Sequence, residues 1–159
     1  MTQEFLQDAI VKDLEGLFQH KKLKNSMGTE QTVRIYAQDA PIRSGDDETT
    51  DPADLPEPYV VVRLQGGELP EQDTSQKVEA ILTICVCDQA PDRQGYRDAL
   101  HIVNAILHHY GGNGVVANRY VVKYPIRWVT QEDDTHPYYF AGMALAFEAP
   151  AIFKEVPEV

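Results

Sequence analysis

One stretch of this sequence, Pro91–Pro150, constrains the fold most, because it predicts a helix, a turn and two long strands in succession. In its first part, apolar residues recur at steps of three and four, which is typical of one face of a helix: Tyr96, Ala99, Leu100, Val103, Ile106, Leu107 and Tyr110. Asp92 can cap the start of this helix, and Gly111-Gly112 can end it in a left-handed conformation.

The rest of this stretch alternates between apolar and other residues, which predicts two strands, each with one apolar face. Between Arg119 and Thr130 the alternating residues are Tyr120, Val122, Tyr124, Ile126 and Trp128. Between Tyr138 and Glu148 they are Tyr139, Ala141, Met143, Leu145 and Phe147. A helix packed on an antiparallel pair of strands would bury all three faces. Because proline cannot donate a ladder hydrogen bond, Pro125 indicates an edge position or a bulge.

The chain before this stretch predicts one more helix and three more strands: Phe5–Phe18, then Thr32–Ala37, Tyr59–Gln65 and Gln76–Asp88. Basic residues follow the first helix and suit the negative end of its dipole: His20, Lys21, Lys22 and Lys24. A length of 159 residues suits one domain. We therefore predict a single α+β domain over residues 1–152, in the order α-β-β-β-α-β-β. It has a mainly antiparallel sheet of about five strands, with two helices packed on one face, and residues 153–159 form a short tail.

The formal net charge is −11, and much of the acidic excess lies in residues 39–57 and 132–134. Such a chain has no general footprint for nucleic acid, so we expect no specific binding of DNA. Residues 38–57 lose all periodicity and predict a long acidic loop. Its carboxylates do not match the spacing of a calcium-binding D-x-D-x-D-G loop, so we predict no metal site there.

No catalytic constellation is evident. His101 and His108 are two helical turns, about 10 Å, apart with no third ligand between them, and His109 lies off the apolar face. Cys85 and Cys87 share one face of a predicted strand but are too far apart to bridge, which indicates free thiols in a reducing compartment. Phosphate-binding glycine loops are missing, as is any run of about 18 apolar residues or a signal-like start. We therefore predict no enzyme activity, no cofactor and no membrane association.

The strand at 76–88 carries more apolar residues than one buried face requires. Its even positions are uniformly apolar, and its odd positions begin polar but continue as Ile81, Thr83, Cys85 and Cys87. We expect this second face to be covered either by the chain itself or by another subunit.

Several short sequence segments resemble those of small tail-completion proteins of tailed bacteriophages and prophages, of the tail terminator kind. They lie at Glu57–Arg63 (EPYVVVR), Val78–Asp88, Gly95–Leu100 (GYRDAL), Tyr124–Trp128 (YPIRW) and Pro137–Glu148 (PYYFAGMALAFE). The resemblance covers residues 32–152, and the last phrase is the most telling. The acidic loop matches no pattern of that family.

The resemblance implies one α+β domain that assembles as a hexameric ring on the finished tail tube. Such a ring stops growth of the tube and offers the surface on which the head connector docks. The implied partners are other copies of the chain, the tail tube protein and the head-tail connector protein. The protein would be found in the virion at the head-tail junction, and in the host cytoplasm during assembly.

A ring requires a contact between two different patches of neighbouring subunits. The candidate patches are the half-apolar strand face at Ile81, Thr83 and Cys85, the turn at residues 66–75, and an opposed face with Arg127, Tyr138 and Phe140. We further expect Asp46, Asp47, Glu48 and Asp51 to face the bore of the ring, where they would repel passing DNA.

Three other functional interpretations are compatible with the sequence. The first is a head-completion or connector adaptor protein of similar size. The second is a small metal- or ligand-binding enzyme domain that uses the histidines and cysteines, which bound stoichiometric zinc would reveal. The third is a cellular interaction module with no link to a phage.

Overall fold

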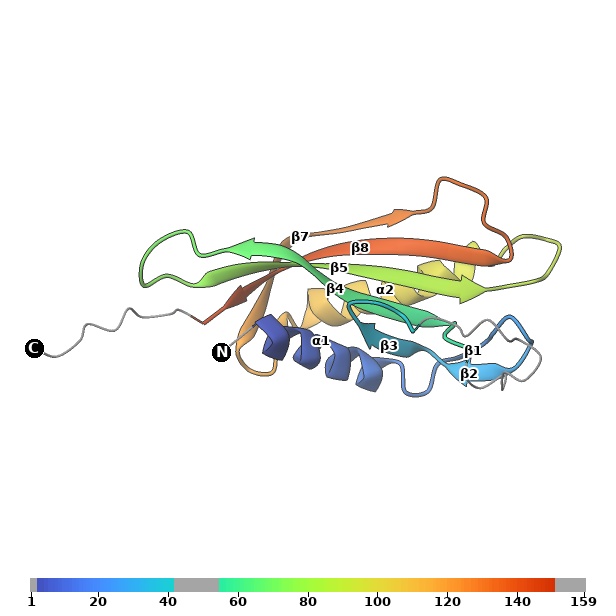
Figure 1. Ribbon diagram of the computed structural model, residues 1–159, viewed down its shortest axis with the longest axis horizontal. Coiled ribbons are helices and arrows are strands. Elements are labelled where there is room, and N and C mark those ends of the chain that lie inside the picture. Colours follow the sequence, from blue (N-terminus) through green and yellow to red (C-terminus); the bar gives the residue numbers. More distant parts are fainter. Residues whose placement is uncertain (1–2, 42–54, 151–159) are drawn as a thin grey trace, which may run out of the picture.

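The computed structural model describes residues 3–41 and 55–150 (Figure 1). Two helices, α1 (Gln3–Leu17) and α2 (Tyr96–Gly112), accompany eight strands. The strands are β1 (Lys22–Lys24), β2 (Glu30–Thr32), β3 (Arg34–Ala37), β4 (Tyr59–Glu68), β5 (Gln76–Cys87), β6 (Val115–Val116), β7 (Tyr120–Thr130) and β8 (Tyr138–Ala149). The fold is therefore α+β with two helices, as expected.

The main sheet has six strands in the order β3-β4-β5-β8-β7-β6, and β1 pairs with β2 in a separate two-stranded sheet. Every neighbouring pair in the main sheet is antiparallel except β3 and β4, which are parallel. The sheet was expected to have about five strands and to be mainly antiparallel, whereas it has six strands and includes one parallel pair. The difference arises because alternation of apolar residues gives the faces of a strand but not its direction.

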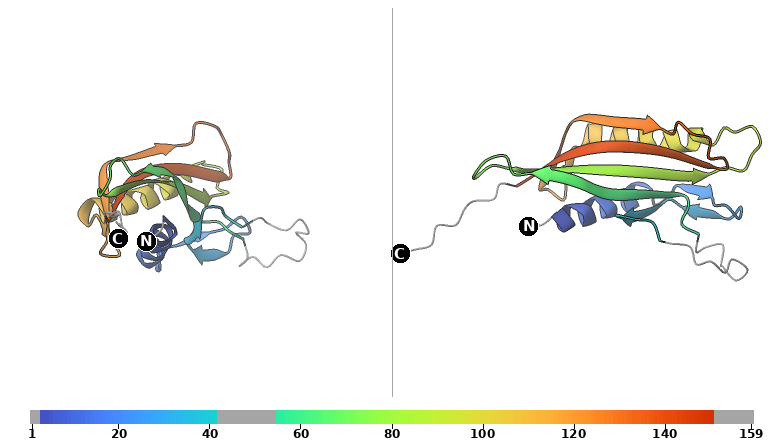
Figure 2. Two further views of the ribbon diagram at one scale, coloured as in Figure 1. Left: turned by 60° about the vertical axis from the view of Figure 1, so that its left-hand side comes forward. Right: turned by 45° about the horizontal axis from the view of Figure 1, so that its top comes forward.

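Both helices lie on one side of the main sheet (Figures 1 and 2). A single core joins them to it. On the sheet, the buried side chains alternate along β5 and β8: Val78, Ala80, Leu82, Ile84 and Val86, then Tyr139, Ala141, Met143, Leu145 and Phe147. We call the side that faces the helices the inner face and the opposite side the outer face. The predicted alternation in these two strands is confirmed.

Helix α1 buries Leu6, Ile10 and Leu14, which recur at four-residue steps and pack into the common core. Phe5, with which the predicted helix begins, lies off this stripe, and its side chain is 62% exposed. The basic residues after α1 do not extend the helix, because α1 ends at Leu17 and Lys22–Lys24 forms β1. A histidine joins the two helices, since His109 Nε2 of α2 lies 2.7 Å from Asp13 Oδ2 of α1.

The ends of α2 differ from expectation. Its N-cap is Gly95, without a side-chain capping bond, and Asp92 instead accepts a hydrogen bond from the Gln94 N–H at 3.3 Å. Gly111-Gly112 lies inside the helix, and neither glycine has a positive φ. The helix ends at Asn113 in an extended conformation, and the Asn113 N–H donates to the His109 carbonyl.

Close packing explains why the N-cap is a glycine. A Cβ at position 95 would lie 2.5 Å from the ring of Tyr139 and 2.7 Å from Asp88 Cβ. The start of α2 therefore rests directly on the ends of β8 and β5, which a side chain at position 95 would prevent.

Strand β7 is irregular where the sequence contains Pro125. Its pairing with β8 shifts register between Lys123 and Arg127, so the predicted bulge is confirmed. Beyond Val121, none of the described strands pairs with the outer edge of β7. Neither described helix combines the length and the apolarity that crossing a membrane requires.

Replacing a core side chain on the inner face should destabilise the domain strongly. Phe147 is fully buried and packs edge-on against Tyr110 with ring centroids 6.1 Å apart. Phe147→Ala should lower the free energy of unfolding by about 3–5 kcal/mol, because it leaves a cavity between α2 and β8. Urea unfolding measures this value. Val129→Ala, at a site 65% exposed, is the matched control and should change it by less than about 0.5 kcal/mol. Equal effects of the two substitutions would contradict this packing.

Candidate subunit interface

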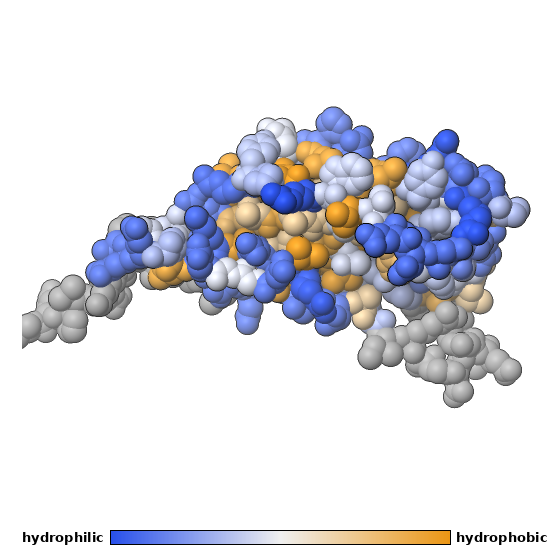
Figure 3. All heavy atoms as spheres, turned by 90° about the horizontal axis from the view of Figure 1, so that it is seen from above, coloured by the Kyte–Doolittle hydropathy of each residue, from blue (hydrophilic) through white to orange (hydrophobic). Residues whose placement is uncertain are grey.

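The outer face of the main sheet is covered by neither helix and is apolar at its centre. Cross-strand registers place its side chains in rows. One row runs Val61, Thr83, Gly142, Val129, and the next runs Arg63, Ile81, Ala144, Arg127. Figure 3 looks onto this side of the molecule and shows apolar residues gathered in the middle, with hydrophilic residues around them. An exposed apolar patch with a polar rim is typical of a protein interaction site.

The centre of the outer face is hollowed. The hollow has a volume of about 130 Å³ and is lined by Ile81, Arg127, Trp128, Val129, Gly142, Met143 and Ala144. Its floor is low because β8 carries the small residues Gly142 and Ala144 there. A Cβ at Gly142 would already lie 3.4 Å from Val129 Cγ2. We call this feature the outer-face hollow.

All six candidate interface residues belong to the outer face. Ile81, Thr83 and Cys85 alternate along β5, Cys85 is paired with Phe140 of β8, and Cys87 is paired with Tyr138. Arg127 of β7 is paired with Ala144 of β8 in the same row as Ile81. The two strand faces that were expected to be separate patches therefore form one surface, because the registers of β5, β8 and β7 bring them together. Whether a neighbouring subunit contacts that surface stays a prediction.

Cys85 differs from the other five because the subunit itself covers it. Cys85 is only 2% exposed and is paired across the strands with Tyr59, whose ring packs edge-on against Tyr36. Burial raises the pKa of Cys85 to about 12 and that of Cys87 to about 11, and the nearby Glu57 carboxylate adds to both shifts. At this end the extra apolar residues of β5 are thus covered by the chain, whereas at the centre of the face they remain accessible.

The same end of the sheet is closed by polar contacts from the segment before β4. Glu57 is 4% exposed, and its carboxylate accepts a hydrogen bond from the Ser26 N–H at 3.0 Å. Gln31 of β2 donates to the backbone carbonyls of Leu55, at 2.7 Å, and of Glu57. These bonds attach the β1–β2 sheet to the start of β4 and give Glu57 a structural role.

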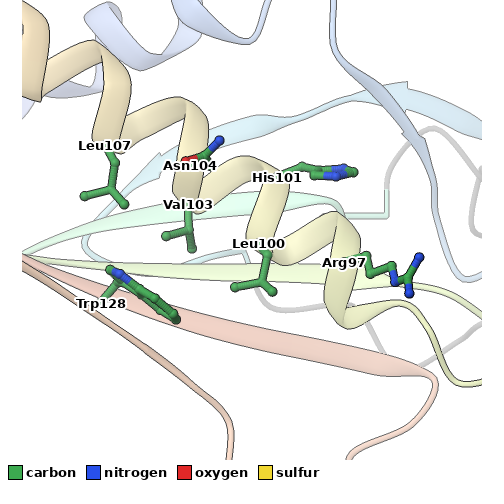
Figure 4. Close-up of a pocket in the computed structure, with 7 residues that line it drawn as sticks. All are labelled: Arg97, Leu100, His101, Val103, Asn104, Leu107 and Trp128. Carbon is green, nitrogen blue, oxygen red and sulfur yellow. The ribbon is translucent and has the colours of Figure 1, made fainter.

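A second apolar depression lies between α2 and β7, and sequence reasoning missed it. Its volume is about 390 Å³, and its lining is Arg97, Leu100, His101, Val103, Asn104, Leu107 and Trp128. Figure 4 shows Leu100, Val103 and Leu107 pointing from α2 toward the side of Trp128. We call it the α2–β7 groove.

The groove exists because β7 does not stay on the core over its whole length. Tyr120 and Val122 are buried. Tyr124, inside the register shift between Lys123 and Arg127, is 73% exposed, and Trp128, just after the shift, is 49% exposed. The alternation in the sequence predicted that these four side chains would share one face packed on the core. Pro125 was the available signal, since a bulge changes both the direction and the pairing of a strand.

The remaining candidates for chemistry form no recognisable centre. No three His, Cys, Asp or Glu side chains in the described part of the chain gather closely enough to hold a metal ion. His136 Nδ1 lies 2.8 Å from the Tyr139 hydroxyl, and both belong to the turn and start of β8. Asp46, Asp47, Glu48 and Asp51, the expected bore-facing residues, lie outside the described residues.

Comparison with known proteins identifies a fold and no family. No family model and no curated protein matches the chain. A solved structure is similar over 99% of both chains, with a TM-score of 0.54 and 12% sequence identity. At that identity the likeness shows the overall fold alone.

The burial of the two cysteines has a measurable consequence. The thiolate is the reactive form, so raised pKa values and lack of access should make both thiols inert in the folded protein. At pH 8, we expect alkylation by iodoacetamide to be at least about 100-fold slower than for the same chain in denaturant. Mass spectrometry of the two sites over time measures the rates. Rapid native modification of Cys85 would show that the end of the sheet near Tyr59 is open.

Proposed function

We propose that this chain is a structural protein of a tailed-phage virion. It would act as a tail terminator or tail-completion protein, capping the tail tube as a ring and joining the tail to the head connector. Its partners would be further copies of itself, the tail tube protein and the connector protein. It would be assembled in the host cytoplasm and would remain at the head-tail junction.

The observation that carries this proposal is the uncovered outer face. The chain has helices for one side of a six-stranded sheet, and it leaves an apolar centre exposed on the other. A chain with a formal charge of −11 has ample polar residues, so this centre is not explained by a shortage of them. A protein that works by assembly needs such a surface. The sequence segments that resemble tail terminators support assembly into a ring on a phage tail.

The geometry of the sheet also suits a ring. The two edges of the sheet are unlike. At one edge the short β3 pairs with Tyr59–Val62 at the start of β4, and at the other the two-residue β6 leaves most of the edge of β7 unpaired. Unlike surfaces meet their neighbours head to tail, and such contacts generate closed rings when the rotation between subunits closes.

The negative charge is compatible with a ring through which DNA passes without binding. Repulsion between carboxylates and phosphates would keep the passing DNA from adhering to the wall of the bore. We propose this role for Asp46, Asp47, Glu48 and Asp51, on the basis of the sequence alone.

Charge placed on the outer face should prevent assembly without unfolding the subunit. Thr83 and Phe140 are half-buried there, on the central strands β5 and β8. Thr83→Asp and Phe140→Asp should abolish incorporation into tails, because a carboxylate buried against a neighbour loses its solvation. Immunoblots of purified virions measure incorporation, and circular dichroism confirms folding. Phe5→Asp, on α1, is the matched control and should assemble normally. Incorporation of both outer-face variants would place the interface elsewhere.

Deleting the gene from its phage or prophage tests the proposed function itself. Electron microscopy of the induced lysate should show overlong or uncapped tails beside separate, filled heads, and a plasmid copy of the gene should restore normal particles. Tails of normal length beside leaking or empty heads would move the protein to the head side of the junction. Intact, infectious virions would exclude a role in virion assembly.

A further inference from the structure

The hairpin between β4 and β5 extends beyond the body of the domain (Figures 1 and 2). We call residues 65–75 of this hairpin the arm. Every residue from Gln65 to Asp73 is exposed, and Leu69 near the tip is 47% exposed. An aliphatic side chain at the end of a projecting hairpin gains nothing from the subunit's own core, so it is available to another surface.

The arm is an ordered feature with specific packing. Pairing of β4 with β5 continues to Glu68 and Lys77, after a register shift between Leu64 and Gly66. At Gly67 a Cβ would lie 2.3 Å from the Lys77 carbonyl oxygen, so glycine permits the close approach of the two strands there. The Thr74 hydroxyl donates to the Glu71 carbonyl at 2.9 Å and closes the turn.

The outer-face hollow offers a matching surface. Its volume of about 130 Å³ compares with the roughly 150 Å³ of an apolar cavity that accommodates benzene, so it suits one aliphatic side chain. Val129 at its wall is 65% exposed, which leaves the hollow open from outside.

Charge is complementary between the two surfaces. The arm carries Glu68, Glu71 and Asp73 and no basic residue. At the rim of the hollow, Arg127 has no acidic partner within the described ranges, whereas Arg63 and Lys123 on the same face are paired at 2.8 Å with Asp39 and Glu148. Arg127 is therefore the rim cation that is available to an incoming carboxylate.

A subunit's own arm cannot fill its own hollow. The arm continues the line of β4 and β5 away from the centre of the sheet, whereas the hollow lies at Ile81, Gly142 and Val129 in that centre. We propose that the hollow receives the arm of a second copy of this chain, with Leu69 inside it and Glu68 or Glu71 beside Arg127. The two surfaces differ, so the contact is heterologous and leaves each copy free to bind a further one.

The contact between two copies does not depend on the proposed function. Only the closure of successive contacts into a ring rests on it. The contact is tested with two single-cysteine additions, Leu69→Cys in one preparation and Val129→Cys in another, mixed at high protein concentration and oxidised mildly. A disulfide requires Cβ atoms about 3.5–4.5 Å apart, so only seated arms can form it. We expect a cross-linked dimer in the mixture, at least fivefold more than in either preparation alone.

Two controls make the result specific. The unmodified chain should give no dimer, because Cys85 and Cys87 are buried. Met27→Cys, at another exposed apolar site, should not cross-link to Val129→Cys. A mixture without the specific dimer overturns the contact, whether the chain is monomeric or assembles through another surface. Neither result alters the outcome of the gene deletion, so failure of the contact and failure of the proposed function are distinguishable.

Discussion

The main sheet has two faces, and both helices of the described residues pack on the same one. Leu6, Ile10 and Leu14 of α1, with the buried side of α2, complete a single core against the inner faces of β5 and β8. The outer face of the sheet has no helix packed on it. One end of the outer face is closed by Tyr59 and the segment around Glu57, and the centre is left apolar and open. Within residues 3–41 and 55–150 no element covers that centre, and an exposed apolar patch of this kind supports the proposal that the protein assembles.

Irregularity in β7 adds a second uncovered region. The shift in pairing at Pro125 leaves Tyr124 and Trp128 outside the core, and it opens the groove against α2. The outer edge of β7 also lacks a partner beyond Val121 among the described strands. Exposed strand edges promote association unless they are protected. The outer-face hollow, the α2–β7 groove and this edge all adjoin β7, so the uncovered apolar surface of the described residues is concentrated around this strand.

Periodicity in the sequence predicted both helices and the alternation of β5 and β8. The missing backbone donor of Pro125 predicted an edge position or a bulge in β7. Periodicity placed Ile81 and Thr83 on one face of β5, and Phe140 on the side of β8 opposite Tyr139, because side chains alternate along a strand. It did not show that these residues share one surface, because that depends on the register between β5 and β8. It could not give the parallel pairing of β3 with β4, because that depends on long-range contact. It missed β1, β2 and β6, which are too short to show a period, and it placed Trp128 in the core because an irregularity interrupts the alternation of β7.

If the protein assembles as proposed, its outer face should become buried. Hydroxyl-radical footprinting, read by mass spectrometry, compares the isolated chain with the same chain in purified tails. The account predicts that oxidation of Phe140, Val129 and Trp128 falls several-fold on assembly, whereas that of Phe5 on α1 changes little. Unchanged oxidation of Phe140 and Val129 in particles that contain the protein would show that the outer face stays exposed, and would contradict the account.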